Sequence, residues 1–152
     1  MSYRLYGVLE IQHSLGRQFP GWLVDGPSIF NAWYCTPTRA WVDGPFAKYF
    51  FDYLNARDQR AYAKRGNQCE HFALRAALEA VDLFRQSRDA EIPAQAESLA
   101  VAWCKYQRTS GEWHEVNLWL LNGVWQPWEP QLMRFFTFSF DEVATVQQIG
   151  VV

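Results

Sequence analysis

An Asn-Gly dipeptide between two alternating segments constrains the fold of this chain more than any other feature. In residues 113–121 the side chains alternate with a period of two, and His114 falls on the more apolar face. Asn122 and Gly123 follow, and residues 124–128 return as a second extended segment. Such alternation is typical of a half-buried strand, and Asn-Gly readily adopts the positive φ angles of a two-residue hairpin turn. The sequence therefore predicts an antiparallel hairpin here.

The other segments place helices before the sheet. Helices are expected where apolar side chains recur every three or four residues, and loops where Gly and Pro cluster. The expected elements are a strand or short helix over 3–12, loops with short helical turns over 16–45, helices over 45–57 and from about 67 or 68 to 88, and strands over 99–107, 113–121, 124–128 and 135–140. This order predicts an α+β fold, with N-terminal helices packed on a C-terminal antiparallel sheet.

Length and composition fit one domain over residues 1–152. Hydrophobic residues make up 49% of the chain, and its mass is 17.8 kDa, which is enough for a substantial core. Fourteen basic and sixteen acidic residues give a net charge of −2, which argues against a dedicated nucleic-acid-binding protein. The oligomeric state does not follow from the sequence.

The sequence also lacks the usual signals of secretion, membrane insertion and metal binding. No apolar run reaches about 18 residues, and the first residues do not resemble a signal peptide. Cys35, Cys69 and Cys104 form an odd, widely spaced set without metal-ligand spacing, which is typical of a reducing compartment. We therefore expect a cytoplasmic protein of a bacterium or a phage-infected cell, with no membrane partner, metal or organic cofactor.

Aromatic residues are unusually frequent, at 17% of the chain. Large aromatic side chains either cover the faces of a sheet or line a cleft, where they stack on sugar or peptide groups. Trp113, Trp125 and Trp128 lie around the predicted hairpin. We take these three as candidate cleft residues, with burial in the core as the alternative.

Cys69, His114 and Glu129 form a pattern with chemical meaning. Cys69 begins a predicted helix, where free backbone N–H groups and the helix dipole stabilise a thiolate. His114 on an inward face needs a polar partner, and the hairpin brings Glu129 of the next strand beside it. A thiol nucleophile, an imidazole base and an orienting carboxylate are the groups that acyl transfer through a thioester needs. These three are the candidate catalytic residues.

Three short segments carry these residues in a recognisable order, namely 67–73, 113–117 and 123–131. Together they resemble the transglutaminase-like core of the papain-like cysteine peptidase superfamily, in particular its small phage and bacterial members. In that core a Cys starts a helix, a His lies on a strand, and an acid followed by Pro lies on the next strand. The resemblance covers about residues 66–131 and leaves the first 65 unmatched.

The resemblance implies a thiol-dependent hydrolase or acyltransferase that acts on an amide or isopeptide bond. Its substrate would be a peptide, a protein or a peptidoglycan-like polymer. Cys69 would attack the carbonyl carbon, His114 would carry the proton, and Glu129 would hold the imidazole. The backbone N–H of Cys69 and the side-chain amides of Gln68 or Asn67 are the candidate oxyanion donors.

A second interpretation keeps the fold without turnover. The chain is then a catalytically inactive papain-like binding or inhibitory module, with a phage gene as one source, and its aromatic patch is the contact surface. A third interpretation is a structural protein of a phage particle.

Asn117 lies on the face of its strand opposite to His114, which points inward. We therefore expect the side chain of Asn117 to be exposed.

Overall fold

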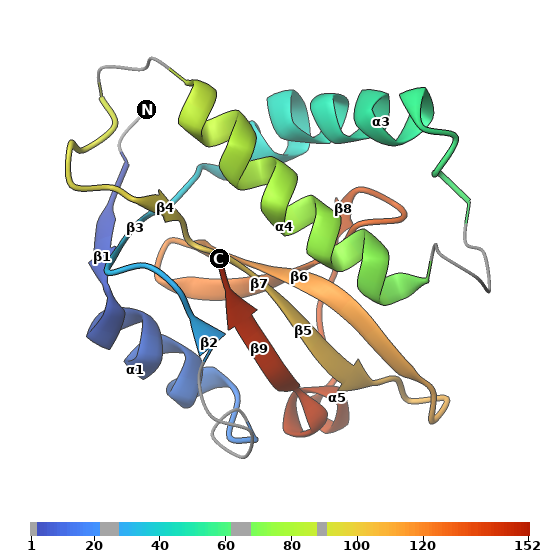
Figure 1. Ribbon diagram of the computed structural model, residues 1–152. Coiled ribbons are helices and arrows are strands. Elements are labelled where there is room, and N and C mark those ends of the chain that lie inside the picture. The colour runs from blue at the N-terminus through green and yellow to red at the C-terminus, as the bar shows by residue number, and fades with distance from the viewer. Residues whose placement is uncertain (1–2, 22–27, 62–67, 88–90) are drawn as a thin grey trace.

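The computed structural model describes residues 3–21, 28–61, 68–87 and 91–152, which form two sheets flanked by helices (Figure 1). The strands in these residues are β1 (Leu5–Gly7), β2 (Ser28–Ile29), β3 (Trp33–Cys35), β4 (Ser98–Leu99), β5 (Val101–Gln107), β6 (Trp113–Leu121), β7 (Val124–Glu129), β8 (Arg134–Phe135) and β9 (Gln147–Val151). The helices are α1 (Val8–Gln18), α2 (Arg39–Trp41), the π-helical turn η2 (Val42–Phe46), α3 (Ala47–Ala56), α4 (Cys69–Gln86) and α5 (Phe140–Thr145). None of these helices combines the length and the apolar character that a bilayer span needs.

The larger sheet has the strand order β2-β9-β5-β6-β7-β8, and the smaller one the order β1-β3-β4. All neighbouring strands are antiparallel except the pairs β2–β9 and β3–β4, which are parallel. The predicted hairpin is confirmed, because β6 and β7 pair from Asn117–Trp128 to Leu121–Val124. Asn122 and Gly123 form the turn with φ angles of 52° and 79°.

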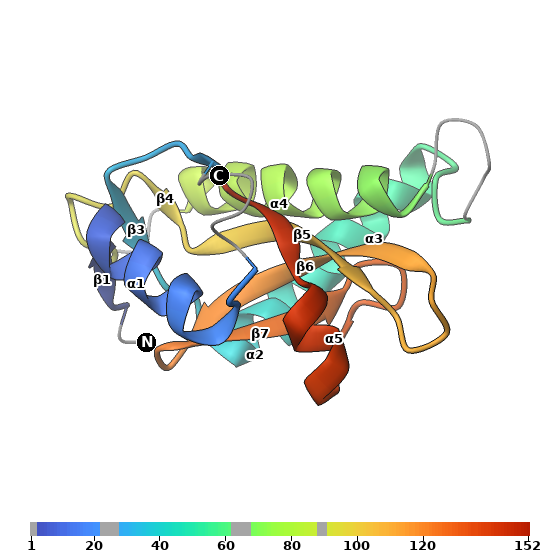
Figure 2. The ribbon, with the colours of Figure 1, turned by 90° about the horizontal axis from the view of Figure 1, so that it is seen from below.

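Two hydrophobic clusters hold the helices against opposite faces of the larger sheet. One face carries Trp119, Leu121 and Trp128, which pack against α3 and α4. The other face packs against residues of α1 and, through Val143, against α5. The views agree, since α4 and α5 lie on opposite sides of β5 (Figure 2). The helix from Cys69 forms as its periodicity predicts, with Phe72, Ala73 and Ala76 among the buried residues that face the sheet.

The expected order of helices first and sheet second is wrong. β1, β2 and β3 lie among the N-terminal helices, and they contain only two or three residues each. Strands this short have too few residues to show an alternation, and their partners lie far along the chain, as in the pairing of β2 with β9. The strand expected over 135–140 is also wrong beyond Phe135, because Ser139 caps α5 by accepting a hydrogen bond from the Glu142 N–H.

Asn117 is fully buried, which contradicts the expectation that its side chain is exposed. Its Nδ2 donates hydrogen bonds to the carbonyl oxygens of Ala73, at 2.8 Å, and Ala102, at 3.2 Å. The face of β6 that carries Asn117 is covered by α4, so a polar residue there must find partners inside the protein. Asn117 thus joins α4 to the centre of the sheet.

Burial of Cys35 predicts a loss of stability in alkaline solution. Burial raises the pKa of this thiol to about 12, from an ordinary value of 9.0. Between these values the unfolded chain loses a proton that the folded chain keeps, so the free energy of unfolding falls as pH rises, by about 1.4 kcal/mol per pH unit for one such thiol. Between about pH 8 and about pH 10.5, the free energy of unfolding measured in urea should fall less for Cys35→Ala than for wild type. Parallel pH profiles would contradict this assignment.

Candidate functional site

His114 and Glu129 meet on neighbouring strands, as the hairpin predicts. The His114 Nε2 lies 2.6 Å from the Glu129 Oε2, and their side chains are only 7% and 10% exposed. The other carboxylate oxygen of Glu129 accepts a hydrogen bond from the N–H of Gln131 at 3.2 Å. The Arg108 Nη2 lies 3.7 Å from the Glu129 Oε2. This carboxylate is therefore fixed by contacts on both oxygens.

The imidazole of His114 lies on the sheet face opposite to α4. Val116, two residues further along β6, belongs to the hydrophobic cluster that includes residues of α1. The edge of the Tyr106 ring also approaches the imidazole, with ring centroids 6.0 Å apart. Because side chains alternate along a strand, His114 shares this face with Val116, whereas Asn117 faces α4.

Cys69 is the first residue of α4, and its polar contacts come from Glu115 and Glu70. The sulfur accepts a hydrogen bond from the backbone N–H of Glu115, and it lies 3.6 Å from the Glu70 Oε2. Burial raises the pKa of the Cys69 thiol, and the charges of Glu70 and Glu115 raise it further against the effect of that N–H. The expected stabilisation of a thiolate at the helix start is therefore outweighed by desolvation and two carboxylates.

Slow alkylation of Cys69 is the expected consequence. With iodoacetamide and peptide mapping, the rate should stay low near neutral pH and rise only above about pH 9, because the thiolate is the nucleophile. Glu70→Gln should speed the reaction at about pH 8 by removing one negative charge. Rapid labelling well below pH 8 that is lost in His114→Ala would contradict this account. That result would favour the predicted roles of Cys69 as nucleophile, His114 as base and Glu129 as orienting acid. These three roles remain predictions.

The structure describes one of the two residues whose side chains are candidate oxyanion donors. Asn67 lies outside the described residues. Gln68 immediately precedes α4, and its backbone N–H donates to the His71 Nδ1 at 3.2 Å. His71 therefore satisfies a backbone group at the start of the helix.

The three candidate cleft tryptophans lie in different environments. Trp128 is fully buried between the sheet and α3, and it packs against Phe46 and Trp119. It therefore belongs to the core on this face of the sheet. Trp113 is 46% exposed, and the Lys105 Nζ lies 5.5 Å from its ring centroid. Trp125 is buried, donates from Nε1 to the Ser14 Oγ at 2.8 Å, and borders a cavity.

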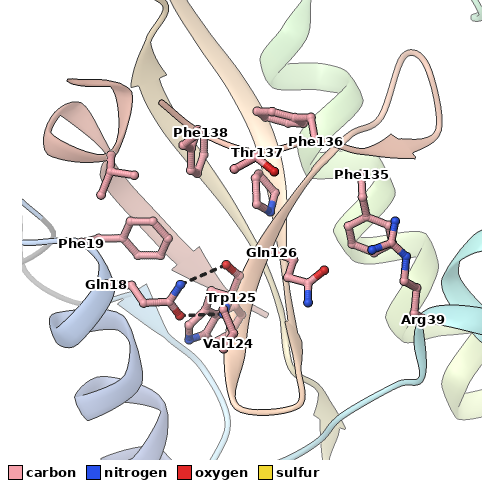
Figure 3. A pocket seen from close by; sticks show the side chains of 12 residues that line it. Gln18, Phe19, Arg39, Val124, Trp125, Gln126, Phe135, Phe136, Thr137 and Phe138 are labelled. Atoms are coloured by element: carbon pink, nitrogen blue, oxygen red, sulfur yellow. Dashed lines mark hydrogen bonds between the residues drawn. The ribbon is translucent and has the colours of Figure 1, made fainter. Parts of the chain in front are cut away.

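This cavity lies along the outer edge of β7 and has a volume of about 440 Å³. Its wall is largely aromatic, with the rings of Phe135, Phe136 and Phe138 around it (Figure 3). The amide of Gln126 lies between the Gln18 side chain and the Arg39–Phe135 pair (Figure 3). We refer to it as the β7 cavity, and its lining residues are Gln18, Phe19, Arg39, Val124, Trp125, Gln126, Pro127, Phe135, Phe136, Thr137, Phe138 and Val143.

The edge of β7 is closed by side-chain and loop contacts. The Gln18 Nε2 donates to the Trp125 carbonyl at 3.1 Å, and its Oε1 accepts from the Trp125 N–H at 2.6 Å, so one amide takes the place of a neighbouring strand (Figure 3). Pro127 has no N–H to leave unpaired, and its carbonyl accepts from the Phe136 N–H at 3.1 Å. The β7 cavity therefore has a backbone wall whose polar groups are already paired.

Aromatic packing fixes the loop that forms the other wall. The ring of Phe138 meets those of Phe19 and Tyr106 edge to face, with centroids 6.2 Å and 4.8 Å apart. On the far side, the Arg39 guanidinium lies 4.5 Å from the centroid of the Phe135 ring. The cavity is thus preformed by ring contacts and needs little ordering to take a ligand.

Comparison with solved structures finds chains that share this fold at low sequence identity. A Polyporus squamosus lectin chain, bound to the human-type influenza-binding epitope Neu5Acα2-6Galβ1-4GlcNAc, matches with a TM-score of 0.71 and 12% sequence identity over 94% of this chain. A second structure, described as a PSL1a-E64 complex, matches with a TM-score of 0.73 and 14% identity, also over 94%. The chain spans about half of the length of each, 49% and 50%. No family model and no curated protein matches the sequence.

These comparisons correct the resemblance to a papain-like or transglutaminase-like core. The fold, with its two sheets, is that of about half of a lectin chain. The resemblance depended on three short segments, whereas the comparisons with solved structures cover 94% of the chain. The prediction of a thiol-dependent hydrolase or acyltransferase depended on that resemblance and is corrected with it.

Residues of the β7 cavity were not among the candidate site residues, apart from Trp125. The aromatic run from Phe135 to Phe138 lies in the segment 135–140, which is predicted to be a strand. Gln18 and Arg39 fell in a segment interpreted as loops and short helical turns. The one available signal was Pro127 within a strand, which indicates an edge strand with an open side.

Proposed function

We propose that the chain is a binding module that takes a carbohydrate in the β7 cavity. The observation that carries the proposal is the lining of this cavity, which combines four phenylalanine rings with the amide of Gln126, the hydroxyl of Thr137 and the guanidinium of Arg39. A sugar ring has apolar C–H faces, which stack on aromatic rings, and hydroxyl groups, which pair with amides and guanidinium groups. The volume of about 440 Å³ lies in the usual range for small-molecule sites.

One of the two neighbouring structures supports this choice of ligand over a peptide or a peptidoglycan-like polymer. Polyporus squamosus lectin is described in complex with a sialylated trisaccharide. The present chain matches only about half of that protein, so its own ligand is part of the proposal. The proposal keeps the alternative of a non-catalytic module with an aromatic contact surface, in which the rings of Phe135, Phe136 and Phe138 join that of Trp125.

Calorimetric titration with Galβ1-4GlcNAc and Neu5Acα2-6Galβ1-4GlcNAc tests the proposal. Wild type should bind, Gln126→Ala should bind about fivefold more weakly through lost hydrogen bonds, and Phe138→Leu about five- to tenfold more weakly through lost ring stacking. Gln12→Ala, on α1 and outside the cavity, is the matched control and should bind like wild type. If wild type binds a glycan and none of these variants changes the affinity, the binding site lies elsewhere. If neither glycan binds to wild type, the proposal is refuted for both glycans.

A further inference from the structure

A further cavity lies between the C-terminal half of α4, the two residues that follow β2 and the start of β4. Its volume is about 360 Å³, within the usual range for small-molecule sites. Among the described residues, none lines both this cavity and the β7 cavity. We refer to it as the α4 cavity, and its wall includes Phe30, Leu78, Val81, Asp82, Arg85 and Ser98.

The apolar part of this wall is open to solvent and already ordered. Phe30 is 66% exposed and Leu78 is 46% exposed, although both are large hydrophobic side chains. The Phe30 ring stacks on that of Trp103, with the centroids 6.4 Å apart and the planes at 23°. Trp103 in turn lies against Gly150, where any Cβ would overlap its ring. The wall therefore offers an apolar group a surface that needs little ordering on binding.

Two opposite charges line the α4 cavity without ion-pair partners. Asp82 and Arg85 are exposed, and neither forms an ion pair with another residue that the structure describes. They are three residues apart on α4, which places them on one face of the helix with Cβ atoms about 5–6 Å apart. Glu79 also lines the cavity, but it accepts a hydrogen bond from the Tyr49 hydroxyl at 2.8 Å. Asp82 and Arg85 are thus both available to a ligand.

Ser98 adds a polar group to the buried part of the lining. Its side chain is fully buried at the start of β4, and its Oγ has no hydrogen-bond partner among the described residues. A buried hydroxyl without a partner is costly, and a ligand or a water molecule in the cavity can supply one. This orphaned hydroxyl is an observation, independent of the charges, that points to an occupied cavity.

We propose that the α4 cavity binds a free α-amino acid with an apolar side chain. The ammonium group of the ligand pairs with Asp82, its carboxylate pairs with Arg85, and its side chain packs against Phe30 and Leu78. A purely cationic ligand would be repelled by Arg85, and a purely anionic one by Asp82 and Glu79. The mixed charge of the lining therefore favours a ligand that carries both charges. This inference does not depend on carbohydrate binding.

Titration of the wild-type protein with four probes, followed by two-dimensional NMR, tests the inference. L-Leucine should cause saturable shifts of the backbone amides of Asn31, Leu78 and Asp82 at concentrations up to about 20 mM. Glycine lacks the apolar side chain, N-acetyl-leucine lacks the ammonium charge, and leucinamide lacks the carboxylate. Each of these three should bind about three- to tenfold more weakly than L-leucine.

Two charge variants assign the contacts. Asp82→Asn should lose the preference for L-leucine over N-acetyl-leucine and keep the preference over leucinamide, because Arg85 is intact. Arg85→Gln should show the reverse. Asp52→Asn removes an exposed carboxylate of α3 outside the cavity, so it is the matched control and should keep both preferences. All three side chains are exposed, so each variant should fold.

The complementary loss of one preference in each variant would support the inference. Three results would overturn it, namely no saturable shifts with L-leucine, equal affinity for L-leucine and its two derivatives, or a preference that survives in the variant expected to lose it. Glycan titration of Asp82→Asn should match wild type, because Asp82 does not line the β7 cavity. The two sites can therefore fail separately.

Discussion

Replacing Trp128 by alanine should lower the free energy of unfolding by about 3–5 kcal/mol. The Trp128 side chain is fully buried, and its ring centroid lies 5.6 Å from that of Phe46 and 6.1 Å from that of Trp119. Removal of this ring leaves a large void between the sheet and α3, where rigid neighbours cannot fill the space. Equilibrium unfolding in urea measures the effect.

Trp128→Phe is the matched control. It keeps a ring in the core, and it removes an indole N–H that is buried without a partner among the described residues. The loss should therefore be smaller, below about 2 kcal/mol. If Trp128→Ala left stability nearly unchanged and weakened glycan binding instead, Trp128 would be a ligand-contacting residue, and its assignment to the core would be wrong.

Replacing Glu129 by alanine should destabilise the protein by about 3–5 kcal/mol, because it leaves His114 buried without its carboxylate. The pair has 2.6 Å between Nε2 and Oε2, and Arg108 is a further partner of the same oxygen. Glu129→Gln keeps the size of the side chain and an oxygen acceptor, so it should cost less, at about 1–2 kcal/mol. Urea unfolding of both variants measures the contribution of the His114–Glu129 pair to stability.

Glycan titration of the same two variants shows whether the pair belongs to the binding site. Glu129 and His114 are absent from the lining of the β7 cavity, so the folded fraction of each variant should bind like wild type. A stable Glu129→Ala protein would contradict the structural contribution that its buried contacts indicate.

Sequence patterns predicted the elements whose signals are local. The α4 helix and the β6–β7 hairpin each contain enough residues to show their periodicity. Asn122 and Gly123 adopt the positive φ angles that the hairpin turn needs. The His114–Glu129 contact followed from this hairpin, because an inward imidazole needs a polar partner.

The parts that depend on distant contacts could not be predicted in this way. β1, β2 and β3 are too short to carry a pattern and exist through partners far along the chain, such as β9. Asn117 is buried because α4 covers its face, which no local signal reveals. The pKa of Cys69 depends on its burial and on Glu115 from another element, so its position at a helix start predicted the wrong direction.

The candidate site shows the same limit. The β7 cavity brings together α1, α2, the edge of β7 and residues 135–138, and α1 and α2 lie far from β7 along the chain. Its aromatic residues were visible in the composition, but their gathering around Gln126 depends on the tertiary fold (Figure 3). A correct prediction of single elements therefore left the functional hypothesis directed at a different set of residues.

A two-dimensional NMR titration of the wild-type protein with Galβ1-4GlcNAc tests the central claim most directly. We predict saturable shifts of the Gln126 and Gln18 side-chain amides and of the backbone amides of Phe136, Thr137 and Phe138 at glycan concentrations up to about 10 mM. The resonances of the backbone amides around Cys69 should not shift. No shifts in the cavity residues, or saturable shifts confined to Cys69 and His114, would contradict the assignment of the β7 cavity as the carbohydrate site.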